Sequence, residues 1–288
     1  MDDLKSLDNW CNQLIKYFQI YFSFLFLFAF AILISACATT QDKSDITDTE
    51  AELSITVLYD NYAITEGTKA DWGFSCLIKT ADTTILFDTG RNGEILLQNS
   101  ENLGVNLKAI DQIVISHIHP DHIGGLDAVL QKKPKVSVYF PISTPSSFNE
   151  NIVNRNGVPI QVAEPVKLAE HVYLTGEMGE QIKEQSLILE TREGLVLVTG
   201  CSHQGIANIL QLAKEMFNRE IILVIGGFHL QNYDNAGIEG IIKEFKTMGV
   251  QQCGASHCTG DTAMALFENV YGENFITMGV GKIIRYSN

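Results

Sequence analysis

The sequence predicts an α+β domain in which two β-sheets lie between two layers of helices, an αββα sandwich. Three observations lead to this prediction. From residue 53 onward, short apolar and β-branched runs predominate, helical patterns are interleaved with them in two halves of the chain, and histidines follow the ends of several apolar runs. With 288 residues, 45% of them hydrophobic, the chain has enough apolar material for one large globular domain or two small ones.

The strands are predicted from alternating or wholly apolar runs bounded by turn residues. These runs cover 53–59, 74–79, 83–87, 110–115, 136–140, 166–168, 172–174, 186–190, 195–198, 221–225, 250–254, 275–277 and 282–285. Helical spacing of apolar residues, with glycines as end signals, predicts helices at 94–102, 126–131, 206–216, 238–248 and 261–270. The alternation of these elements in two halves is what predicts two sheets covered by helices.

The first 36 residues predict a signal peptide or a membrane anchor. Residues 17–36 carry no charge and are dominated by Phe, Leu and Ile. At about 1.5 Å per residue, such a run spans roughly 30 Å, enough to cross a bilayer. It ends in Ile34-Ser35-Ala36-Cys37, which resembles the bacterial lipobox, so we expect Cys37 to carry a lipid, with an uncleaved anchor as the alternative.

The next segment, residues 37–52, is polar and acidic and predicts a flexible tether, which leaves 53–288 as the folded domain. The formal net charge of −14 disfavours nucleic acid as a partner, because such a surface repels phosphate backbones. The expected location is therefore the bacterial cell envelope, with the membrane reached through the N-terminal lipid or anchor. Six unevenly spaced cysteines do not form a disulfide framework, although a bridge between Cys253 and Cys258 is conceivable.

The run Ser116-His117-Ile118-His119-Pro120-Asp121-His122 is the strongest indication of chemistry in the chain. On extended backbone, alternate residues point the same way, so His117 and His119 converge on one point. Asp121 and His122 are adjacent and are expected to face a second point a few ångströms away. Imidazole and carboxylate are ligands for zinc, manganese or iron, and a catalytic zinc keeps one position open for water.

Three later histidines also follow apolar runs. His203 comes after 195–198, His229 after 221–225 and His257 after 250–255. Loops at strand ends are where a rigid scaffold presents ligands, so these side chains are candidates for the same site. His171 has no such context, and we interpret it as an ordinary surface histidine.

The run from His117 to His122 resembles the His-x-His-x-Asp-His motif of the metallo-β-lactamase superfamily, and Asp88-Thr89-Gly90 resembles its upstream Asp-Thr-Gly element. The segments Thr199–His203, Gly226–Leu230 and Ser256–Gly260 resemble a narrower group, the dihydropterin ribofuranosylaminobenzene 5'-phosphate synthase-like proteins. The resemblance covers about residue 53 to the C-terminus. It implies a metallo-β-lactamase fold, an αββα sandwich with a binuclear site.

By position, the resemblance implies that two divalent ions, zinc or alternatively manganese or iron, are each held by three side chains. The first set is His117, His119 and His203, and the second is Asp121, His122 and His257. Many relatives place a bridging Asp where this chain has Cys201 after Gly200. Cys201 is expected to contact a ligand or the substrate, with a soft bridging ligand or a core residue as alternatives.

Four further roles remain expectations. Asp88 is expected to accept a hydrogen bond from a ligand imidazole, or else to be a simple turn residue. His229 is a candidate substrate contact or proton donor, or else a buried structural partner. Asp121 is a candidate for orienting the attacking water. Free amides before the last long helix, at Cys258-Thr259-Gly260, suit an anion such as phosphate, unless Thr259 is only the N-cap.

These features predict a hydrolase in which metal-activated water attacks an ester, phosphoester or lactone of a small, possibly phosphorylated, molecule. A second hypothesis is a transferase that joins a pterin unit to a ribosylaminobenzene phosphate, as the name of the narrower group implies. A third is a metal-binding lipoprotein without turnover. The complete histidine and aspartate set favours catalysis, because sequestration needs no open coordination position.

Overall fold

The computed structural model describes residues 52–287 of the chain, and they form one compact unit of two sheets and their covering helices. The predicted signal segment, the lipidation site at Cys37 and nearly all of the predicted tether lie outside these residues; Glu52 already belongs to the first strand. Among the described residues, no helix combines the length and the apolar character needed to cross a bilayer.

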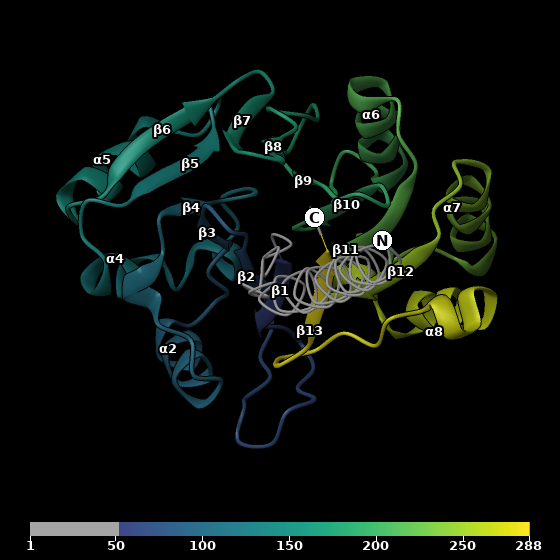
Figure 1. The fold of residues 1–288 in the computed structure, drawn as a ribbon, viewed down its shortest axis with the longest axis horizontal. Helices are drawn as coiled ribbons and strands as arrows, with labels where there is room; N and C mark the ends of the chain where they lie inside the picture. The colour runs from purple at the N-terminus through teal and green to yellow at the C-terminus, as the bar shows by residue number, and fades with distance from the viewer. Residues whose placement is uncertain (1–51, 288) are drawn as a thin grey trace, which may run out of the picture. The chain divides into compact units, whose positions relative to one another are not determined.

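The first sheet has seven strands and the second has six (Figure 1). In spatial order, the first sheet consists of β13 (Ile283–Ser287), β1 (Glu52–Tyr59), β2 (Ser75–Lys79), β3 (Thr84–Phe87), β4 (Gln112–Val114), β5 (Ser137–Pro141) and β6 (Val158–Val162). The second consists of β12 (Gln252–Ser256), β11 (Ile221–Gly227), β10 (Leu195–Thr199), β9 (Leu187–Glu190), β8 (Val172–Leu174) and β7 (Val166–Ala169).

Each sheet has a parallel part and an antiparallel part. Strands β3 to β6 run parallel to one another, as do β10 to β12, whereas β1, β2 and β13, and β7 to β10, pair antiparallel. The carboxyl ends of parallel strands lie at the same edge of a sheet, and ligands commonly bind there. This edge is therefore the place to look for a site in each sheet.

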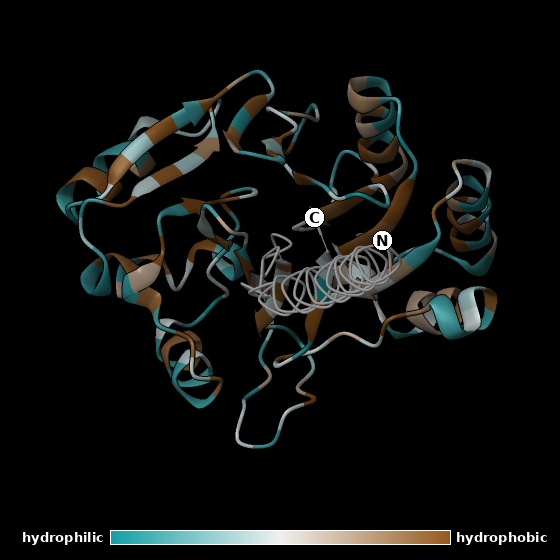
Figure 2. Ribbon diagram, viewed as in Figure 1, coloured by the Kyte–Doolittle hydropathy of each residue, from teal (hydrophilic) through white to brown (hydrophobic). Residues whose placement is uncertain are grey.

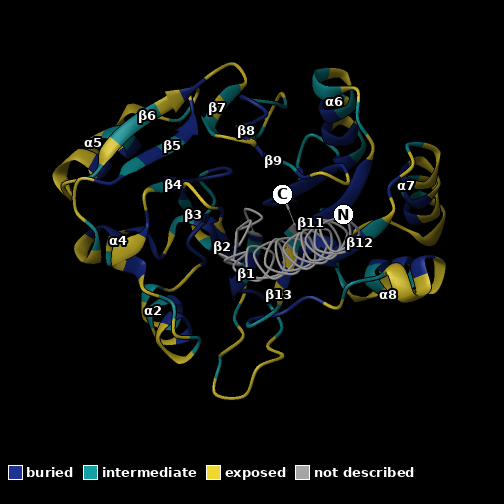
Figure 3. Ribbon diagram, viewed as in Figure 1, coloured by how far each residue is buried: buried dark blue, intermediate teal, exposed yellow. Residues whose placement is uncertain are grey.

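Helices cover the outer face of each sheet, as the αββα prediction requires. Those on the first sheet are α2 (Gly93–Asn102), α4 (Leu126–Lys132) and α5 (Ser146–Asn154), with the short α3 (Pro120–Ile123) beside them. Those on the second are α6 (Ile206–Phe217), α7 (Asn235–Thr247) and α8 (Asp261–Tyr271). Figure 3 shows exposed residues gathered on the outward sides of these helices.

The core is layered because successive strand residues point to opposite faces. In β10, Val196 and Val198 face the core between the two sheets, and Leu195 and Leu197 face the helices of the second sheet. All five residues of β10 are buried, and Figures 2 and 3 show β10 and β11 as apolar and buried nearly throughout. Burial on both faces explains why these strands read as continuous apolar runs in the sequence.

Most predicted elements are confirmed within a few residues, one predicted strand is wrong, the conceivable disulfide is not formed, and the single turn α3 and two longer elements were not predicted. The run 275–277 forms only an isolated bridge between Phe275 and Cys253. Helix α5 and strand β6 were not predicted, because α5 is polar in sequence and β6 contains Pro159, which only an edge strand such as β6 tolerates. The four described cysteines, Cys253 and Cys258 among them, are free thiols.

Candidate metal centre

The loop that follows β4 carries the first four candidate ligands. His117 and His119 leave the strand with their rings 4.5 Å apart, and Nε2 of His117 lies 3.0 Å from Nδ1 of His119. Pro120 then starts helix α3, where its missing N–H and fixed φ suit the first turn. This single turn of helix brings His122 back beside His117, with ring centroids 4.2 Å apart.

The second sheet contributes one histidine from the carboxyl end of each parallel strand. His203 follows β10 and lies 4.7 Å from His117 and 4.9 Å from His119, measured between ring centroids. His257 follows β12 and lies 5.1 Å from His122. His229 follows β11 and lies 4.5 Å from His203. His171, in contrast, is half exposed and contacts only surface glutamates.

Two sets of donor atoms result, each set lying within 4.8 Å. One consists of His117, His119 and His203, and the other of Asp121, His122 and His257. These are the two sets that the resemblance implies. Their members come from both sheets, so the site lies where the two parallel edges meet.

Asp88, at the end of β3, anchors the first-sheet side of the site. Its Oδ2 lies 2.7 Å from Nδ1 of His122, and its two oxygens accept hydrogen bonds from the N–H and the hydroxyl of Ser116, both at 2.7 Å. The Ser116 hydroxyl lies 2.9 Å from Nδ1 of His117. Asp88 is fully buried, and its burial raises the pKa of the carboxyl well above the ordinary value, despite these hydrogen bonds.

Glu184 anchors the second-sheet side, and sequence reasoning missed it. Its Oε1 accepts hydrogen bonds from the N–H groups of Cys201 (2.7 Å) and Ser202 (2.9 Å). Its Oε2 accepts from the N–H of His203 and contacts Nδ1 of the same residue, both at 2.9 Å. Although full burial acts in the opposite direction, His117 and the hydrogen bonds from His203 lower the pKa of Glu184 below its usual range.

The signal for Glu184 in the sequence is weak. It is an acidic residue three positions before the apolar start of β9, among the polar residues Lys183, Gln185 and Ser186. Acidic residues at strand starts are common on protein surfaces, so nothing in the sequence marks this one as buried.

Asn61 and Trp72 also contact the site without having been predicted. Oδ1 of Asn61 lies 3.1 Å from Nδ1 of His257, and its Nδ2 donates to the His257 carbonyl. The indole N–H of Trp72 donates to Oδ2 of Asp121 at 2.8 Å, and the Trp72 ring lies 5.0 Å from the His257 ring. Both residues belong to the loop after β1, which has no metal-binding pattern in the sequence.

The outer nitrogens of four imidazoles are thus already partnered. Nδ1 of His117, His122, His203 and His257 contacts Ser116, Asp88, Glu184 and Asn61 respectively. Such partners fix the tautomer so that Nε2 presents a lone pair to the centre. The buried Nε2 of His257 has no hydrogen-bond partner, although it lies 3.2 Å from Oδ2 of Asp121.

The protonation states also suit divalent cations. Burial, followed by the neighbouring imidazoles, lowers the pKa of His117 well below its ordinary value and that of His122 to about 3. Burial, together with His203, lowers the pKa of His119 as well. These three rings are therefore neutral at pH 7, whereas the hydrogen bond with Asp121 raises the pKa of His257, although burial acts in the opposite direction. Imidazole nitrogens beside the Asp121 carboxylate form a set of donors that fits zinc-like ions.

The loops that aim these side chains use unusual backbone. Asp88, Ser202, His229 and His257 all have φ between 49° and 62°, the left-handed region that residues other than glycine seldom adopt. Gly200 lets the loops of the two sheets approach, because a Cβ there would lie 2.2 Å from Oγ of Ser116. The geometry of the site is therefore fixed by backbone packing as well as by hydrogen bonds.

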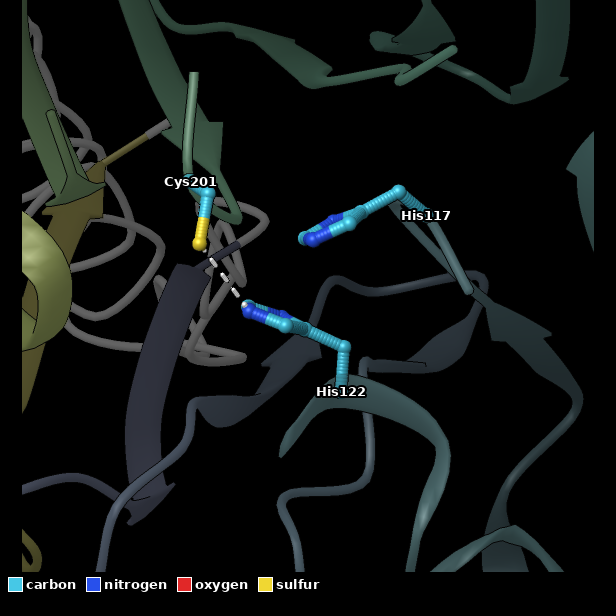
Figure 4. Close-up of side chains that lie close together, drawn as sticks. All are labelled: His117, His122 and Cys201. Atoms are coloured by element: carbon cyan, nitrogen blue, oxygen red, sulfur yellow. Dashed lines mark hydrogen bonds between the residues drawn. The ribbon is translucent and has the colours of Figure 1, made fainter. Parts of the chain in front are cut away.

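The remaining predicted site residues lie at or near the centre. Sγ of Cys201 lies 3.2 Å from Nε2 of His122 (Figure 4). Thr259 is fully buried and its hydroxyl accepts from the Phe228 N–H at 3.0 Å, whereas Gly260 is the N-cap of α8. The alternative interpretation of Thr259 as the N-cap is therefore wrong.

Two cavities open beside the centre. A cavity of about 650 Å³ is lined by Met178, Gly179, Glu180, Gln181, Ile182, His203, Gln204, Asn208 and His229. A smaller one of about 380 Å³ lies on the side of His257 and Trp72 and reaches the start of α8. The larger cavity touches the first donor set through His203 and the smaller one touches the second through His257.

Comparison with known proteins agrees with this geometry. The sequence profile described as the Metallo-beta-lactamase superfamily matches residues 73–203. The chain is 30% identical over 247 residues to the 7,8-dihydropterin-6-methyl-4-(beta-D-ribofuranosyl)-aminobenzene-5'-phosphate synthase of Methanocaldococcus jannaschii, covering 70% of this chain and 84% of the synthase. The chain belongs to the metallo-β-lactamase superfamily.

Further comparisons extend this result. An uncharacterized Methanocaldococcus jannaschii protein is 30% identical over 263 residues, covering 80% of this chain and 99% of that protein. A solved metal-dependent hydrolase of the β-lactamase superfamily is 28% identical with a TM-score of 0.69, covering 82% of this chain and all of that chain. A Bacillus subtilis metallo-β-lactamase fold protein, 15% identical, has a TM-score of 0.63 over the same shares of the two chains. The predicted fold class and family are confirmed.

Proposed function

We propose that this protein is a metal-dependent hydrolase that cleaves an ester, phosphoester or lactone of a small molecule. The observation that carries the proposal is the pair of three-residue donor sets, of which the first meets a cavity of about 650 Å³ through His203 and the second meets a cavity of about 380 Å³ through His257. His117, His119 and His203 would hold one divalent ion, and Asp121, His122 and His257 the other. When bound, such ions activate water and polarise a substrate oxygen.

Asp121 and His229 are positioned to assist from opposite sides. Asp121 accepts a hydrogen bond from the Trp72 indole. His257 and His122 lower the pKa of Asp121, although its partial burial acts in the opposite direction. The carboxylate is therefore ionised and accepts hydrogen bonds. His229 lines the larger cavity, and its Nδ1 has no hydrogen-bond partner. A hydrogen bond with Cys258 raises the pKa of His229, which favours the protonated ring that can donate to a leaving group.

The cavity lining favours an uncharged substrate group. The described residues that line it include three amides, Gln181, Gln204 and Asn208, and none of them is a lysine or arginine. Gln204 lines the cavity, and neither of its polar side-chain atoms has a hydrogen-bond partner within the protein. Within the proposed range, an ester or lactone fits this lining better than a phosphate monoester does.

The test is metal analysis of the purified full-length chain combined with a panel of esters, lactones, phosphodiesters and phosphomonoesters. We expect metal-dependent turnover of at least one class, which His119→Ala abolishes. His171→Ala is the matched control, because this histidine lies on the surface away from the donors, and it should keep full activity. If a metal-loaded protein turned over none of the panel, the hydrolase proposal would fail and a non-catalytic metal-binding role would be favoured.

A second candidate function is the condensation that forms a pterin-ribosylaminobenzene phosphate, since the synthase named above is 30% identical over most of its length. Product formation from a dihydropterin donor and a ribosylaminobenzene phosphate, with no hydrolysis of the panel, would favour it.

We further propose that the protein is a lipoprotein of the bacterial cell envelope, tethered through Cys37. The support is the uncharged run 17–36 and the lipobox-like residues before Cys37. We expect labelled fatty acid to be incorporated in the wild type and lost in Cys37→Ser, with Cys11→Ser as control. Unchanged processing and membrane association of Cys37→Ser would overturn this proposal.

A further inference from the structure

The metal centre contains more donor atoms than the two proposed ligand sets use. Cys201, Cys258 and His229 supply further donor atoms close to the same centre. Both cysteines are buried and free, with 3% and 2% of their surface exposed. A buried thiol among imidazoles is either a ligand or a packed side chain, and its position distinguishes the two.

Cys201 occupies a position that the two sets share. Its sulfur lies within 4.8 Å of the donor atoms of His117 and His122, and also within 4.8 Å of those of His203 and His229. It lies within the same distance of the donors of His257 and Cys258. Figure 4 shows the sulfur on the side of the His117 and His122 ring tips, with its marked contact to His122. The thiol therefore lies close to histidines of both sets. A side chain that only supported one ligand would lie close to that ligand alone.

The backbone holds Cys201 firmly in this place. Its N–H donates to Glu184 at 2.7 Å, in the same carboxylate cradle that holds His203. The preceding Gly200 packs against Ser116 and Asp88 of the first sheet. The sulfur is thus fixed relative to histidines of both sheets.

Cys258 belongs to fewer of these donor groups than Cys201 does. Its sulfur contacts the carbonyl oxygen of Cys201 at 3.7 Å, and the metal-ligand group to which it belongs contains only Cys201 and His257 besides itself. Cys258 therefore packs against the Cys201 loop, with His257 and His229 as its other neighbours.

We propose that Cys201 is a thiolate ligand shared by the two metal ions, and that Cys258 is a positioning residue that supports the Cys201 loop. On binding, the S–H bond of Cys201 breaks, the proton passes to solvent and a sulfur–metal bond forms, with no change in oxidation state. Thiolate is a soft ligand, so this centre should prefer zinc to manganese. The inference rests on the proposed function only in requiring that metal binds, and its test measures ligation rather than turnover.

The test is X-ray absorption at the zinc edge of the full-length, zinc-loaded protein, with metal content measured on the same samples. We expect a sulfur shell at about 2.3 Å beside nitrogen and oxygen at about 2.0–2.1 Å. If Cys201 is shared, each of two zinc ions has one sulfur neighbour. A sulfur neighbour on only half of the zinc ions would mean that Cys201 binds one ion and would overturn its shared role. The absence of a sulfur shell in the wild type would overturn the proposal as a whole.

Matched variants assign the sulfur. Cys201→Ser should remove the sulfur shell, and Cys258→Ser should retain it, because serine keeps a donor for the Cys201 carbonyl. Cys253→Ser, also a buried thiol but outside every donor group, controls for the general effect of losing a buried sulfur. A shell that persists in Cys201→Ser and disappears in Cys258→Ser would assign ligation to Cys258 and overturn the proposal.

A substitution that changes the ligand class gives a second readout. Cys201→Asp replaces the soft thiolate with a hard carboxylate and should lower the ratio of zinc to manganese affinity, measured by competition titration. An unchanged ratio in a folded Cys201→Asp protein would contradict the role of Cys201 as a ligand, whatever reaction the protein catalyses.

Discussion

The two sheets contribute to the metal centre in different ways. The first supplies His117, His119, Asp121 and His122 from a single loop after β4, whereas the second supplies His203, His229 and His257 from three separate strand ends. Each side has a buried anchoring carboxyl group. Burial raises the pKa of Asp88, whereas the partners of Glu184 lower the pKa of Glu184. The first sheet's carboxyl group therefore tolerates being neutral, whereas the second sheet's loops depend on a charge.

Glu184→Gln should have the largest effect. The amide nitrogen of glutamine would face N–H groups of the Cys201–His203 loop that now donate to the carboxylate, so buried donors lose their acceptor. We expect a loss of about 3–5 kcal/mol in the free energy of unfolding, the range typical of breaking a buried charged network. Chemical denaturation followed by circular dichroism measures this loss.

Glu193→Gln is the control for Glu184→Gln, because Glu193 is exposed near the start of β10. It should leave stability within about 0.5 kcal/mol of the wild type. An equally stable Glu184→Gln protein would mean that the two sheets do not differ in their dependence on charge.

Metal removal should have the next largest effect. If metal is present at 100 times its dissociation constant, chelation should lower the free energy of unfolding by about 2.7 kcal/mol per site that saturates independently. Scanning calorimetry with and without chelator measures the change. His119→Ala supplies the comparison, because a protein that no longer fills the first site should lose less stability on chelation. An identical loss in this variant would contradict the assignment of His119 as a metal ligand.

Asp88→Asn should separate metal affinity from folding. The asparagine amide can donate to the Ser116 hydroxyl, so we expect the stability of the metal-free protein to change by about 1 kcal/mol or less. The same amide would force His122 into the other tautomer, with Nε2 protonated toward the centre, and metal affinity should fall about 10- to 100-fold. Titration calorimetry and denaturation give the two values.

A result in which Asp88→Asn loses stability as severely as Glu184→Gln would contradict the contrast between the two anchors. Asp111→Asn is the control, since this aspartate of the first sheet lies on the surface and accepts a hydrogen bond only from the Thr84 N–H.

Asp60→Asn should differ from the other variants, because its effect depends on pH and stabilises the protein. Burial raises the pKa of Asp60 to about 6, and its Oδ2 has no hydrogen-bond partner. Because the folded pKa lies above the unfolded value, wild-type stability from this group is greatest below about pH 4 and is lost as the pH rises toward 6. In the metal-free protein, Asp60→Asn should remove this decline and gain about 2–3 kcal/mol at pH 8 relative to pH 4, since each unit of pKa shift corresponds to about 1.4 kcal/mol.

Thermal melts of wild type and Asp60→Asn at pH 4 and pH 8 measure the difference. Parallel pH profiles for the two proteins would show that the Asp60 carboxyl is not destabilised when ionised.

The same contrast explains how much could be predicted from the sequence. The first sheet's ligands form a contiguous motif, so backbone geometry alone predicts that His117 and His119 converge. The histidines of the second sheet could be predicted only as candidates at strand ends, because their meeting depends on strands far apart in the sequence. Glu184, Asn61 and Trp72 were not predictable, since each acts through a contact with a histidine loop remote in the chain and none has a distinctive local pattern.

Trp72 gives the centre an optical reporter of its own. Apart from Trp10 it is the only tryptophan of the chain, and its indole contacts both Asp121 and His257. In a Trp10→Phe protein, the emission of Trp72 alone would respond to whatever binds beside these two side chains. A paramagnetic ion such as Co²⁺ would quench it, so occupancy of the second donor set can be followed in real time without any label or known substrate.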